Sequence, residues 1–598
     1  MIKDRLCKLR LEMKAAGIDC YLIPTSDFHD SEYVSSFFMV RKFFSGFTGS
    51  AGTLVVTKDR AVLFTDGRYF IQAEQELAGT GIQLMKMGEP DVPTLIQYLE
   101  RQLGEGECLG FDGRVVMADD AEQYEEILQR KKVRICWDRD LAEKIWLDRP
   151  KLVHHPVFRL EECYSGEETA SKIARVREKM ESEGADAHIL TTLDDIAWLL
   201  NIRGNDVESC PVVLAFCIIT MEQVFLFADS ENQNAWSYEM KQYLKEMGVT
   251  FLNYDDFYGY LSKLQSKRIL LCKARISCRL SKELLPGTQI IDRPNPTSLM
   301  KAVKNQTEIE NLREAHLKDG IAVTRFMYWL KQNVGKIPMD EVSVAEFLES
   351  LRRKEQDFIE SSFDTICAYG ANGAIIHYSA SPDACAEIKP EGLLMVDSGG
   401  HYLQGSTDVT RTFVLGPVTE EMKNHFTLVL RAMLSLKTSR FLYGCRGVNL
   451  DIKAREVLWE QGLDYKHGTG HGVGYLLNVH EGPNSFRWKL MPDYQDNAVL
   501  EEGMVTTDEP GIYIEGSHGI RIENELLCRK GTKNEYGQFM YFEDLTCVPI
   551  DLDGVELSLL GEVDKKRLNA YHQEVYERLA PYFQGEELVW LRHTTREI

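Results

Sequence analysis

Two aspartates in the second half of the chain could hold a divalent cation between neighbouring strands. Residues 393–396 (LLMV) predict a buried strand that ends in Asp397. Residues 407–414 predict a second strand, whose period of two puts Asp408 and Thr410 on one face. Asp397 and Asp408 would then face each other across a hairpin-like pair. Two unpaired carboxylates so close together repel each other, and a divalent cation would remove that repulsion.

Two glutamates and an arginine occur at similar places further along the chain. Glu509 directly follows the run 504–508 (MVTTD). Residues 519–525 (GIRIENE) alternate apolar with charged side chains, which predicts that Arg521 and Glu523 share one face of a strand. Charged groups at the ends of apolar runs are costly to bury unless something binds them. These segments are therefore further candidates for a binding site.

A glycine-rich run, residues 467–474 (HGTGHGVG), separates the two acidic regions. Its glycines would let the backbone approach a ligand closely. His467 and His471 lie four residues apart, as in a helical zinc protease motif. That motif needs a glutamate directly after its first histidine, and this chain has Gly468 there.

The elements that must position these residues begin with a repeat in the first half of the chain. Both copies predict a helix, a glycine that ends it and a buried strand. They align without gaps at an offset of 167 (177 − 10). The identical pairs are Arg10 and Arg177, Met13 and Met180, Gly17 and Gly184, Asp19 and Asp186, and Asp27 and Asp194.

The repeat predicts two homologous α/β domains ahead of the region that carries the candidate site. Proline pairs near residues 149–156 and 293–296 interrupt the periodicity and mark the boundaries. We expect domains at 1–155, 156–297 and 298–598. About three to five domains are expected for a globular chain of this length.

The charge of the chain argues against nucleic acid and membrane partners. The net charge is −23, from 69 basic and 92 acidic residues, and it repels phosphate backbones and anionic lipid surfaces. The longest nearly unbroken apolar stretch, residues 211–219, is far shorter than the roughly 18 residues of a membrane span.

The fourteen cysteines are scattered singly and form no Cys-x-x-Cys pair, which is typical of free thiols in a reducing compartment. The amino terminus predicts a charged helix and shows no secretory signal. We therefore expect a cytoplasmic protein.

Each candidate residue has an ordinary explanation when it is taken alone, because a lone aspartate after a strand usually belongs to a turn. Taken together they follow the order Asp, Asp, His, Glu, Glu, with intervals of 11 (408 − 397), 63 (471 − 408), 38 (509 − 471) and 14 (523 − 509). This order resembles the M24 metallopeptidases, which have the creatinase/aminopeptidase or pita-bread fold. The phrases that carry the resemblance are VDSG, TDVTRT, HGTGHGVG, TDEPG and GIRIEN.

The resemblance implies a ligand set for two divalent metal ions. The implied ligands are Asp397, Asp408, His471, Glu509 and Glu523. Four carboxylates balance the charge of two divalent ions, and the imidazole adds a borderline-soft donor. Such an oxygen-rich set suits Mn²⁺, with Co²⁺ or Zn²⁺ as substitutes.

The same resemblance implies hydrolysis by a metal-bridged hydroxide. Two metals roughly 3.5 to 4 Å apart would bind a water and lower its pKa toward about 7. Asp397 would chelate one ion, and Asp408 and Glu523 would bridge both. His471 and Glu509 would complete the other site, with Glu509 also carrying the proton to the departing nitrogen.

The resemblance also assigns residues around the metals. His377 (NGAIIHY) and His480 (NVHEGP) would line the pocket and hydrogen-bond the scissile carbonyl or its tetrahedral intermediate. His467 would be a further pocket histidine, and Arg521 would orient the bridging carboxylates. The alternatives are structural histidines and, for Arg521, a surface ion pair.

The number of domains implies the subgroup of the family. Two domains ahead of the catalytic one resemble the three-domain cytosolic Xaa-Pro aminopeptidases, which release the first residue of peptides whose second residue is proline. Matching phrases run through the whole chain, among them PTSDFHDSEY, SGFTGSAGT and LDDIAWLLNIRGNDVE. The expected architecture is two creatinase-like α/β domains and a pita-bread catalytic domain with a C-terminal extension.

Two alternatives stay open. One is a prolidase, which cleaves only Xaa-Pro dipeptides; the other is a pita-bread domain that binds peptide or protein without catalysis. The loop between His471 and Glu509, which contains Trp488 and Asp496, is longer than the resemblance predicts. An apolar stripe after residue 565 (Leu568, Tyr571, Val575, Leu579 and later Leu588 to Leu591) either caps the core or forms a dimer surface, and we expect a homodimer.

Overall fold

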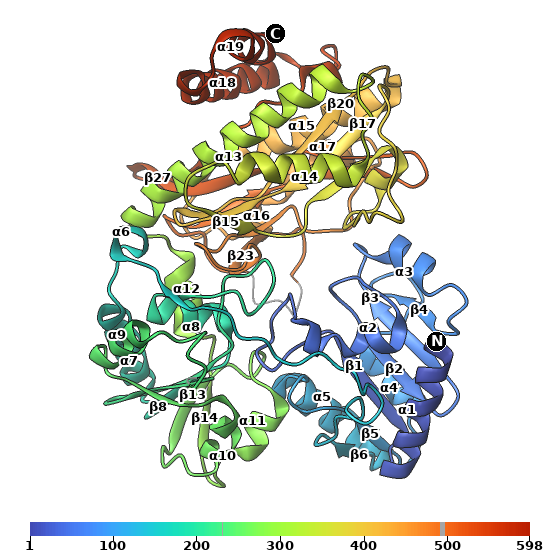
Figure 1. Cartoon of the computed structure of the whole chain (residues 1–598), viewed down its shortest axis with the longest axis vertical. Coiled ribbons are helices and arrows are strands. Elements are labelled where there is room, and N and C mark those ends of the chain that lie inside the picture. The colour runs from blue at the N-terminus through green and yellow to red at the C-terminus, as the bar shows by residue number, and fades with distance from the viewer. Residues whose placement is uncertain (230, 491–496) are drawn as a thin grey trace. The chain divides into compact units, whose positions relative to one another are not determined.

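The computed structural model describes residues 1–229, 231–490 and 497–598. These residues form two compact units (Figure 1). The first unit contains Met1–Leu160 and Glu167–Thr297, and the second contains Glu161–Gly166 and Ser298–Ile598. The predicted domain limits 1–155, 156–297 and 298–598 stay a prediction.

The first unit contains two six-stranded sheets of the same topology. The first sheet has the order β4-β3-β2-β1-β5-β6, and the second has the order β12-β11-β10-β8-β13-β14. The strands of the first are β1 (Cys20–Pro24), β2 (Thr53–Thr57), β3 (Ala61–Thr65), β4 (Gln83–Lys86), β5 (Cys108–Gly110) and β6 (Arg134–Cys136). Those of the second are β8 (Ala187–Leu190), β10 (Phe216–Thr220), β11 (Val224–Ala228), β12 (Val249–Asn253), β13 (Arg268–Leu271) and β14 (Gln289–Asp292). A short pair, β7 (Phe158–Arg159) and β9 (Ile202–Arg203), adds to them.

The predicted repeat is confirmed at the level of single hydrogen bonds. Nε of Arg10 donates to the carbonyl of Thr57 at 2.9 Å, and Nε of Arg177 donates to the carbonyl of Thr220 at 2.9 Å. Asp19 accepts from the backbone N–H of Cys108, as Asp186 accepts from that of Arg268. Gly17 and Gly184 end their helices with φ of 67° and 66°, a left-handed conformation that favours glycine.

Helices cover these sheets because their apolar faces must be buried. Leu6, Leu9 and Met13 of α1 lie in one apolar cluster with β1 and β2. The helices of this unit are α1 (Ile2–Ala16), α2 (Val40–Ser45), α3 (Phe70–Glu76), α4 (Leu95–Gln102), α5 (Ala118–Leu128), α7 (Thr169–Glu183), α8 (Leu193–Leu200), α9 (Tyr238–Glu246), α10 (Phe257–Leu261) and α11 (Cys278–Glu283). Helix α12 (Pro296–Ala302) spans the boundary at Thr297 and Ser298.

The second unit is built on an antiparallel sheet of order β21-β28-β27-β24-β22-β23. Its strands are β21 (Arg440–Leu442), β22 (Gly470–Gly472), β23 (Glu481–Phe486), β24 (Val505–Asp508), β27 (Asn524–Asn534) and β28 (Gly537–Asp544). A second sheet contains β16 (Ile366–Tyr369), β17 (Leu393–Ser398) and β20 (Val409–Val414). Smaller sheets contain β15 (Phe358–Ser361), β18 (Gly400–Tyr402) and β19 (Gly405–Ser406), and β25 (Gly511–Ile514) with β26 (His518–Arg521).

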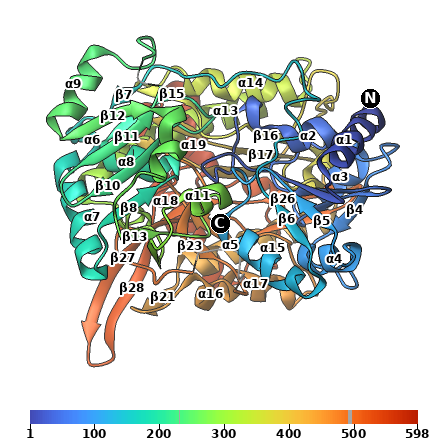
Figure 2. The ribbon, with the colours of Figure 1, turned by 90° about the horizontal axis from the view of Figure 1, so that it is seen from below.

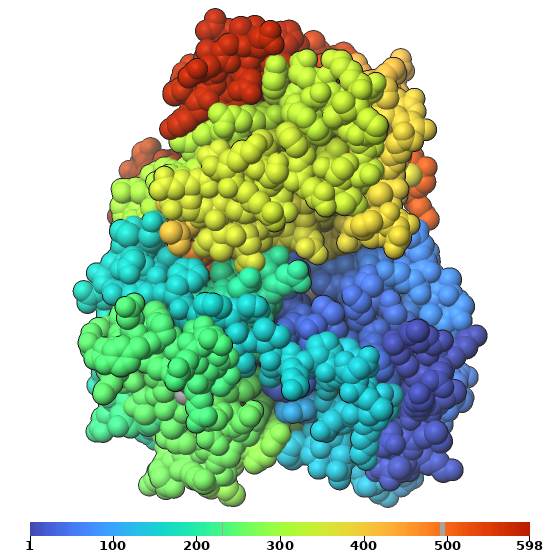
Figure 3. Space-filling model, viewed as in Figure 1, coloured from blue at the N-terminus to red at the C-terminus, as the bar shows by residue number. Residues whose placement is uncertain are grey.

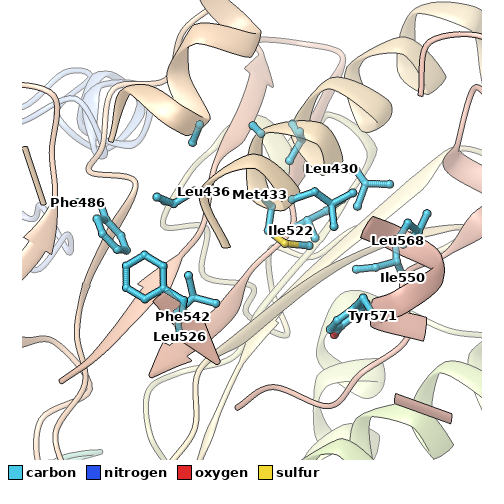
Figure 4. Close-up of a cluster of buried hydrophobic side chains, with 14 of the residues drawn as sticks. Leu430, Met433, Leu436, Phe486, Ile522, Leu526, Phe542, Ile550, Leu568 and Tyr571 are labelled. Atoms are coloured by element: carbon cyan, nitrogen blue, oxygen red, sulfur yellow. The ribbon is translucent and has the colours of Figure 1, made fainter. Parts of the chain in front are cut away.

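Figure 2 shows β27 and β28 extending as a long hairpin beyond their neighbouring strands. The core of this unit lies between the large sheet and the helices that cover it. Leu430, Met433 and Leu436 of α15 (Glu420–Lys437) face Leu526 and Phe542 of the sheet (Figure 4). The remaining helices of the unit are α13 (Gln306–Asn333), α14 (Glu341–Arg352), α16 (Gly447–Leu450), α17 (Ile452–Trp459), α18 (Glu562–Leu579) and α19 (Gly585–Thr594).

A short helix, α6 (Glu162–Ser165), belongs to the second unit although its neighbours in sequence belong to the first. Asn305 caps the start of α13, because its side chain accepts from Glu308 N–H while Glu308 accepts from Asn305 N–H. The amide of Asn305 also donates to the carbonyl of Ser165 at 2.8 Å. The amide of Asn311 donates to the carbonyl of Cys163 at 2.9 Å.

The C-terminal stripe is part of the core of its own unit. Leu568, Tyr571, Val575 and Leu579 are buried and lie in the main apolar cluster. In Figure 3 the C-terminal helices (red) lie next to α13 (light green). The alternative that the stripe caps the core is therefore confirmed for these four residues, because their own sheet and helices cover them. The homodimer itself stays a prediction.

All fourteen cysteines lie among the described residues, and all are free thiols. In the described part of the chain, no helix has the length and apolar character that crossing a membrane requires.

Candidate metal centre

The two aspartates lie on adjacent strands, as the sequence predicts. Strands β17 and β20 pair antiparallel, with Asp397 opposite Thr410. Asp408 directly precedes β20, and its backbone N–H donates to Oε1 of Glu525 at 2.7 Å. Both aspartates are buried. The hairpin-like arrangement is confirmed, with β18 and β19 between the two strands in sequence.

The two glutamates lie where strands of the large sheet end or begin. Glu509 follows β24, and Glu523 directly precedes β27. The single strand expected over residues 519–525 is wrong, because β26 ends at Arg521 and β27 begins at Asn524. The cause is a change of partner: Glu523 N–H donates to the carbonyl of Thr410 in β20 at 3.1 Å. This break turns the carboxylate of Glu523 toward the aspartates.

His471 lies in the short strand β22, between β23 and β24. Its Nδ1 lies 2.9 Å from the carbonyl oxygen of Gly472, an acceptor, so Nδ1 carries the proton. The other ring nitrogen, Nε2, is 3.5 Å from Oδ2 of Asp408 and 3.7 Å from Oε1 of Glu509. Nε2 is therefore the ring nitrogen that faces the carboxylates.

The glycines beside His471 serve strand packing. A Cβ at Gly470 would lie 1.8 Å from the carbonyl oxygen of Thr507, and one at Gly472 would lie 2.2 Å from that of Glu481. The sequence interpretation, that the glycines admit a ligand, is therefore incomplete. They let neighbouring strands come close enough to hold His471 in place.

The ligand atoms of Asp408, His471 and Glu523 all lie within 4.8 Å of one another. Burial, reinforced by the neighbouring carboxylates, raises the pKa values of Asp408 and Glu523 well above the usual range. Burial also raises the pKa of Glu509 to about 7. A site that crowds buried carboxylates in this way destabilises their charged forms unless a cation joins them.

The donor set fits divalent metal ions. Oδ1 of Asp397 is buried and has no hydrogen-bond donor within residues 1–229, 231–490 and 497–598. A buried oxygen of this kind usually has a partner. Carboxylate oxygens and one imidazole nitrogen are donors that Mn²⁺, Co²⁺ and Zn²⁺ accept. The residues that could hold the ions are Asp397, Asp408, His471, Glu509 and Glu523.

Arg521 joins this set to two aromatic residues. Its Nη2 donates to Oδ2 of Asp397 at 2.5 Å, and its Nη1 donates to the hydroxyl of Tyr513 at 2.7 Å. That hydroxyl lies 2.9 Å from Nε2 of His467, whose Nδ1 is 3.9 Å from Oε2 of Glu509. Arg521 is only 2% exposed, so the alternative of a surface ion pair is wrong.

The two other predicted pocket histidines are both half-buried. The ring of His480 packs edge-to-face against that of His471, with 4.3 Å between the ring centroids. His377 follows the short 3₁₀ helix Gly370–Ala374. The carbonyl of the preceding residue, Ile376, lies 3.5 Å from Nη2 of Arg521. The structure thus places His480 directly beside a candidate ligand and His377 next to the Arg521 contact.

Sequence reasoning missed the residues that support the ligands. The hydroxyl of Thr410 donates to Oε2 of Glu523 at 2.7 Å. Glu525, which accepts from the backbone of Asp408, lies 3.2 Å from Nε2 of His316 in α13. The available signal was proximity in sequence: Tyr513 follows Glu509 by four residues, Thr410 follows Asp408 by two, and Glu525 follows Glu523 by two. Of the long loop after His471, Trp488 is 47% exposed, and Asp496 lies outside the described residues.

Four segments of the chain match known protein families. Residues 310–530 match metallopeptidase family M24, and residues 538–598 match the C-terminal region of that peptidase. Residues 5–136 and 148–308 each match a creatinase/prolidase N-terminal domain. The expected fold class, two creatinase-like domains followed by a pita-bread catalytic domain, is confirmed.

Several relatives resemble the whole chain. A probable Xaa-Pro aminopeptidase P of Laccaria bicolor is 40% identical and covers 98% of this chain and 92% of its own length. Aminopeptidase P2 of Arabidopsis thaliana is 37% identical and covers 100% of this chain and 89% of its own. A solved X-prolyl aminopeptidase of Caenorhabditis elegans, described as a cytosolic enzyme with a di-nuclear active site, is 32% identical. It covers 100% of both chains with a TM-score of 0.95.

Proposed function

Because this chain belongs to the Xaa-Pro aminopeptidases of metallopeptidase family M24, we propose that it releases the first residue of peptides whose second residue is proline. The full-length likeness to the Caenorhabditis elegans enzyme is the observation that carries this function. A prolyl bond is a tertiary amide without an N–H, and general peptidases that bind that N–H act on it poorly. Efficient cleavage of such a bond therefore requires a dedicated hydrolase.

We propose that the five residues Asp397, Asp408, His471, Glu509 and Glu523 hold two divalent ions, Mn²⁺ first among them. Their support is the crowding of buried carboxylates and the buried oxygen of Asp397 without a hydrogen-bond donor among the described residues. When bound, the two ions lower the pKa of a water molecule so that it can attack the peptide carbonyl at neutral pH.

We propose Glu509 as the residue that carries the proton from the attacking water to the prolyl nitrogen. Its side chain is 18% exposed, against 5% for Asp408, so it reaches the open side of the site. Nδ1 of His467 lies 3.9 Å from Oε2 and 2.7 Å from the carbonyl oxygen of Gly468, so the ring borders this carboxylate. The backbone fixes Glu509 as well, since its N–H donates to the carbonyl of Thr469 at 2.8 Å.

His480 and His377 are proposed to hydrogen-bond the scissile carbonyl and the oxyanion that forms from it. The contact of His480 with His471 places its ring at the edge of the ligand set. Arg521 holds Asp397 by a direct hydrogen bond. It also binds the hydroxyl of Tyr513, which in turn contacts His467. A cytoplasmic location is proposed as well, with support from the free cysteines and the description of the Caenorhabditis elegans enzyme.

The test compares metal-stripped and Mn²⁺-restored protein on an Arg-Pro-Pro peptide, with detection of released arginine by mass spectrometry. We expect release with Mn²⁺ and a loss of about 10² or more in kcat for Glu509→Ala. An Ala-Ala dipeptide is the substrate control and should stay intact. The isosteric Glu509→Gln variant separates loss of the proton carrier from loss of volume.

The same assay tests the alternatives. Cleavage of an Arg-Pro dipeptide without cleavage of Arg-Pro-Pro would indicate a prolidase. Tight binding of the peptide without turnover, with each of Mn²⁺, Co²⁺ and Zn²⁺, would indicate a non-catalytic peptide-binding domain.

A further inference from the structure

A buried arginine, Arg411, lies in β20 directly after Thr410, whose hydroxyl donates to Glu523. Successive side chains of a strand point to opposite faces, so Arg411 and Thr410 approach Glu523 from different faces of β20. Arg411 is only 2% exposed. All three nitrogens of its guanidinium donate hydrogen bonds, and the acceptors are carbonyl, amide and phenol oxygens. This buried cation is therefore held by neutral groups.

One side of the guanidinium binds the main chain at the break between β26 and β27. Nη1 donates to the carbonyl of Glu523 at 2.6 Å and to the carbonyl of Thr410 at 2.8 Å. Nη2 donates to Oδ1 of Asn524, the first residue of β27, at 2.8 Å. Because Glu523 lies between the two strands, its carbonyl needs a donor from elsewhere, and Arg411 supplies one.

Two consecutive residues of β20 thus bind three polar groups of Glu523. Its N–H donates to the carbonyl of Thr410 at 3.1 Å, and its Oε2 accepts from the hydroxyl of Thr410 at 2.7 Å. Its carbonyl accepts from Arg411. Asp408, which lies close to Glu523 and His471, directly precedes the same strand. The spacing of Asp408 and Glu523 therefore depends on Arg411 as well as on Thr410.

The other side of the guanidinium binds the C-terminal region. Nε donates to the carbonyl of Pro549 at 3.1 Å, and Nη2 donates to that of Val548 at 2.9 Å. Nη2 also donates to the hydroxyl of Tyr571 in α18 at 2.8 Å, and this hydroxyl donates to the carbonyl of Val548 at 2.7 Å (Figure 4). These three residues lie within 538–598, the segment that matches the C-terminal region of the peptidase. One side chain therefore joins that region to a candidate metal ligand.

A buried guanidinium without a bound carboxylate costs stability, and apolar residues often fill such a position at lower cost. Arginine is favoured where one planar group must supply N–H donors in several fixed directions at once. Here the donors reach residues 523–524 on one side and 548–549 on the other. The single ammonium of a lysine lacks this spread. The fork of Arg411 thus holds the two segments at a fixed distance.

We propose that Arg411 is a positioning residue for the metal ligand Glu523, and that its bond to Tyr571 makes the C-terminal region part of the support of the metal centre. The C-terminal region then contributes to metal binding in addition to burying its own apolar stripe. The inference rests on the proposed ligand set. It assigns no contact between Arg411 and the ions or the peptide.

The primary variant is Tyr571→Phe, which removes one hydroxyl and keeps the ring in the apolar core. Calorimetric titration of stripped protein with Mn²⁺ should give a Kd about threefold higher than that of the wild type, because Arg411 loses one acceptor. Arg411→Lys keeps the charge and loses the fork, so its Kd should rise about tenfold or more. Tyr571→Phe decides the matter alone if Arg411→Lys does not fold.

Each variant has a matched control. Tyr576→Phe removes a phenol from the same helix, where the hydroxyl accepts from Arg592. Arg203→Lys changes a second buried arginine, 1% exposed, whose Nη1 also donates to main-chain carbonyls. Arg203 lies in the first unit, which contains none of the candidate ligands. Both controls should bind Mn²⁺ with the wild-type Kd.

The melting temperature separates positioning from a general loss of stability. If Arg411 only stabilises the fold, Arg411→Lys should lower the Tm of stripped and Mn²⁺-loaded protein equally. If it positions Glu523, the rise in Tm at a fixed Mn²⁺ concentration should be smaller in Arg411→Lys and Tyr571→Phe than in the wild type. A wild-type rise in both variants, together with a wild-type Kd, would overturn the proposal.

A crystal structure of stripped Arg411→Lys gives a readout that needs neither metal nor peptide. The main chain of residues 522–524 should shift, and the hydrogen bond from Glu523 N–H to Thr410 should break. An unmoved Glu523 would contradict the proposal even if the wild type bound no Mn²⁺. Changed Mn²⁺ affinities in a protein that cleaves no Xaa-Pro peptide would support the role of Arg411 and refute only the proposed activity.

Discussion

Asp397 binds the guanidinium of Arg521 through one oxygen and turns the other toward the site. Arg521 can make both of its contacts because the guanidinium is forked. Nη1 binds Tyr513 while Nη2 binds Asp397. A lysine would keep the charge but supply a single ammonium on a flexible stem. The geometry of Asp397 therefore depends on the shape of the cation at residue 521 as much as on its charge.

Arg521→Lys should lower kcat/KM on Arg-Pro-Pro by about 10- to 100-fold, the usual cost of disturbing a residue that orients a metal ligand. Calorimetric titration should show weaker Mn²⁺ binding in the same variant. Tyr513→Phe removes only the phenol and should cause the smaller loss. Wild-type kcat/KM and Mn²⁺ affinity in Arg521→Lys would show that the position of Asp397 does not depend on a forked guanidinium.

Metal-free protein should lose stability as the pH rises toward neutrality. The folded pKa of Glu509 is about 7 against an ordinary 4.5, and those of Asp408 and Glu523 are also raised. A group whose pKa is raised on folding stabilises the protein fully below its unfolded pKa. That stability is lost as the pH rises through the folded value. The relevant window is therefore about pH 4.5 to 7.

Scanning fluorimetry of the stripped protein at pH 5.5 and pH 7.5 measures this effect. Added Mn²⁺ should raise Tm more at pH 7.5, where the carboxylates repel one another most, and its binding should release protons. The charge-removing pair Asp408→Asn and Glu523→Gln should flatten the pH dependence of the stripped protein. An equal Mn²⁺ effect at both pH values would show that the carboxylates are already ionised at pH 5.5.

The sequence predicted the candidate ligands and Arg521 beside them but not the other supporting contacts, for a physical reason. Each candidate ligand lies in a phrase of a few residues whose order along the chain is visible. Glu525 and Asp408 are 117 residues apart, and Arg411 and Tyr571 are 160 apart. Contacts over such separations depend on how sheets and helices pack, and a short phrase contains no trace of that packing.

At the scale of elements, helix α18 is docked through a histidine that must stay neutral. Nε2 of His572 accepts a hydrogen bond from the backbone N–H of Ile550 at 3.1 Å, and burial lowers its pKa to about 3. Protonation would remove this acceptor and bury a charge. Since the unfolded chain binds the proton with a pKa near 6.5, stability is lost as the pH falls from 6.5 toward 3.

His572 should therefore cost the folded state about 2 kcal/mol between pH 7 and pH 5. His572→Gln keeps an acceptor for Ile550 without a titrating group, so it should lose less stability than the wild type over that interval. Urea unfolding followed by tryptophan fluorescence at the two pH values measures the difference. Equal pH sensitivity in both proteins would mean that His572 is already protonated in the fold.

Local patterns predicted elements well where one sheet contains the whole strand, as in residues 393–396 and 20–23. They were wrong over residues 519–525 because Glu523 leaves one sheet to bond Thr410 in another. The alternation of Ile520 and Ile522 persists through the break, since both side chains lie in the same apolar core. Periodicity predicts which face of a strand is buried, but it does not predict which strand the backbone hydrogen bonds join.

At the scale of the whole molecule, the two compact units should respond differently to metal. All five candidate ligands lie in the second unit. A ligand that binds only the folded form raises the unfolding temperature of the part that binds it. Differential scanning calorimetry of stripped protein should show two transitions, with Mn²⁺ raising one of them. A single transition that Mn²⁺ shifts upward as a whole would show that the units unfold as one.

The repeat made the architecture of the first unit predictable, because its two copies keep the same helix cap, the same arginine and the same aspartate. Nothing comparable marked the route of the chain between units. Residues 161–166 contain no unusual composition, and their place in the second unit follows only from their contacts with α13.

The catalytic unit is therefore built from two separate stretches of the sequence, 161–166 and 298–598. A stretch that begins at residue 298 would encode α13 but not α6, whose Ser165 and Cys163 carbonyls accept from Asn305 and Asn311. A single recombination event at the boundary therefore separates the catalytic unit from one of its own pieces. Because the chain passes between the units three times, after residues 160, 166 and 297, no single cut in the sequence yields both units intact.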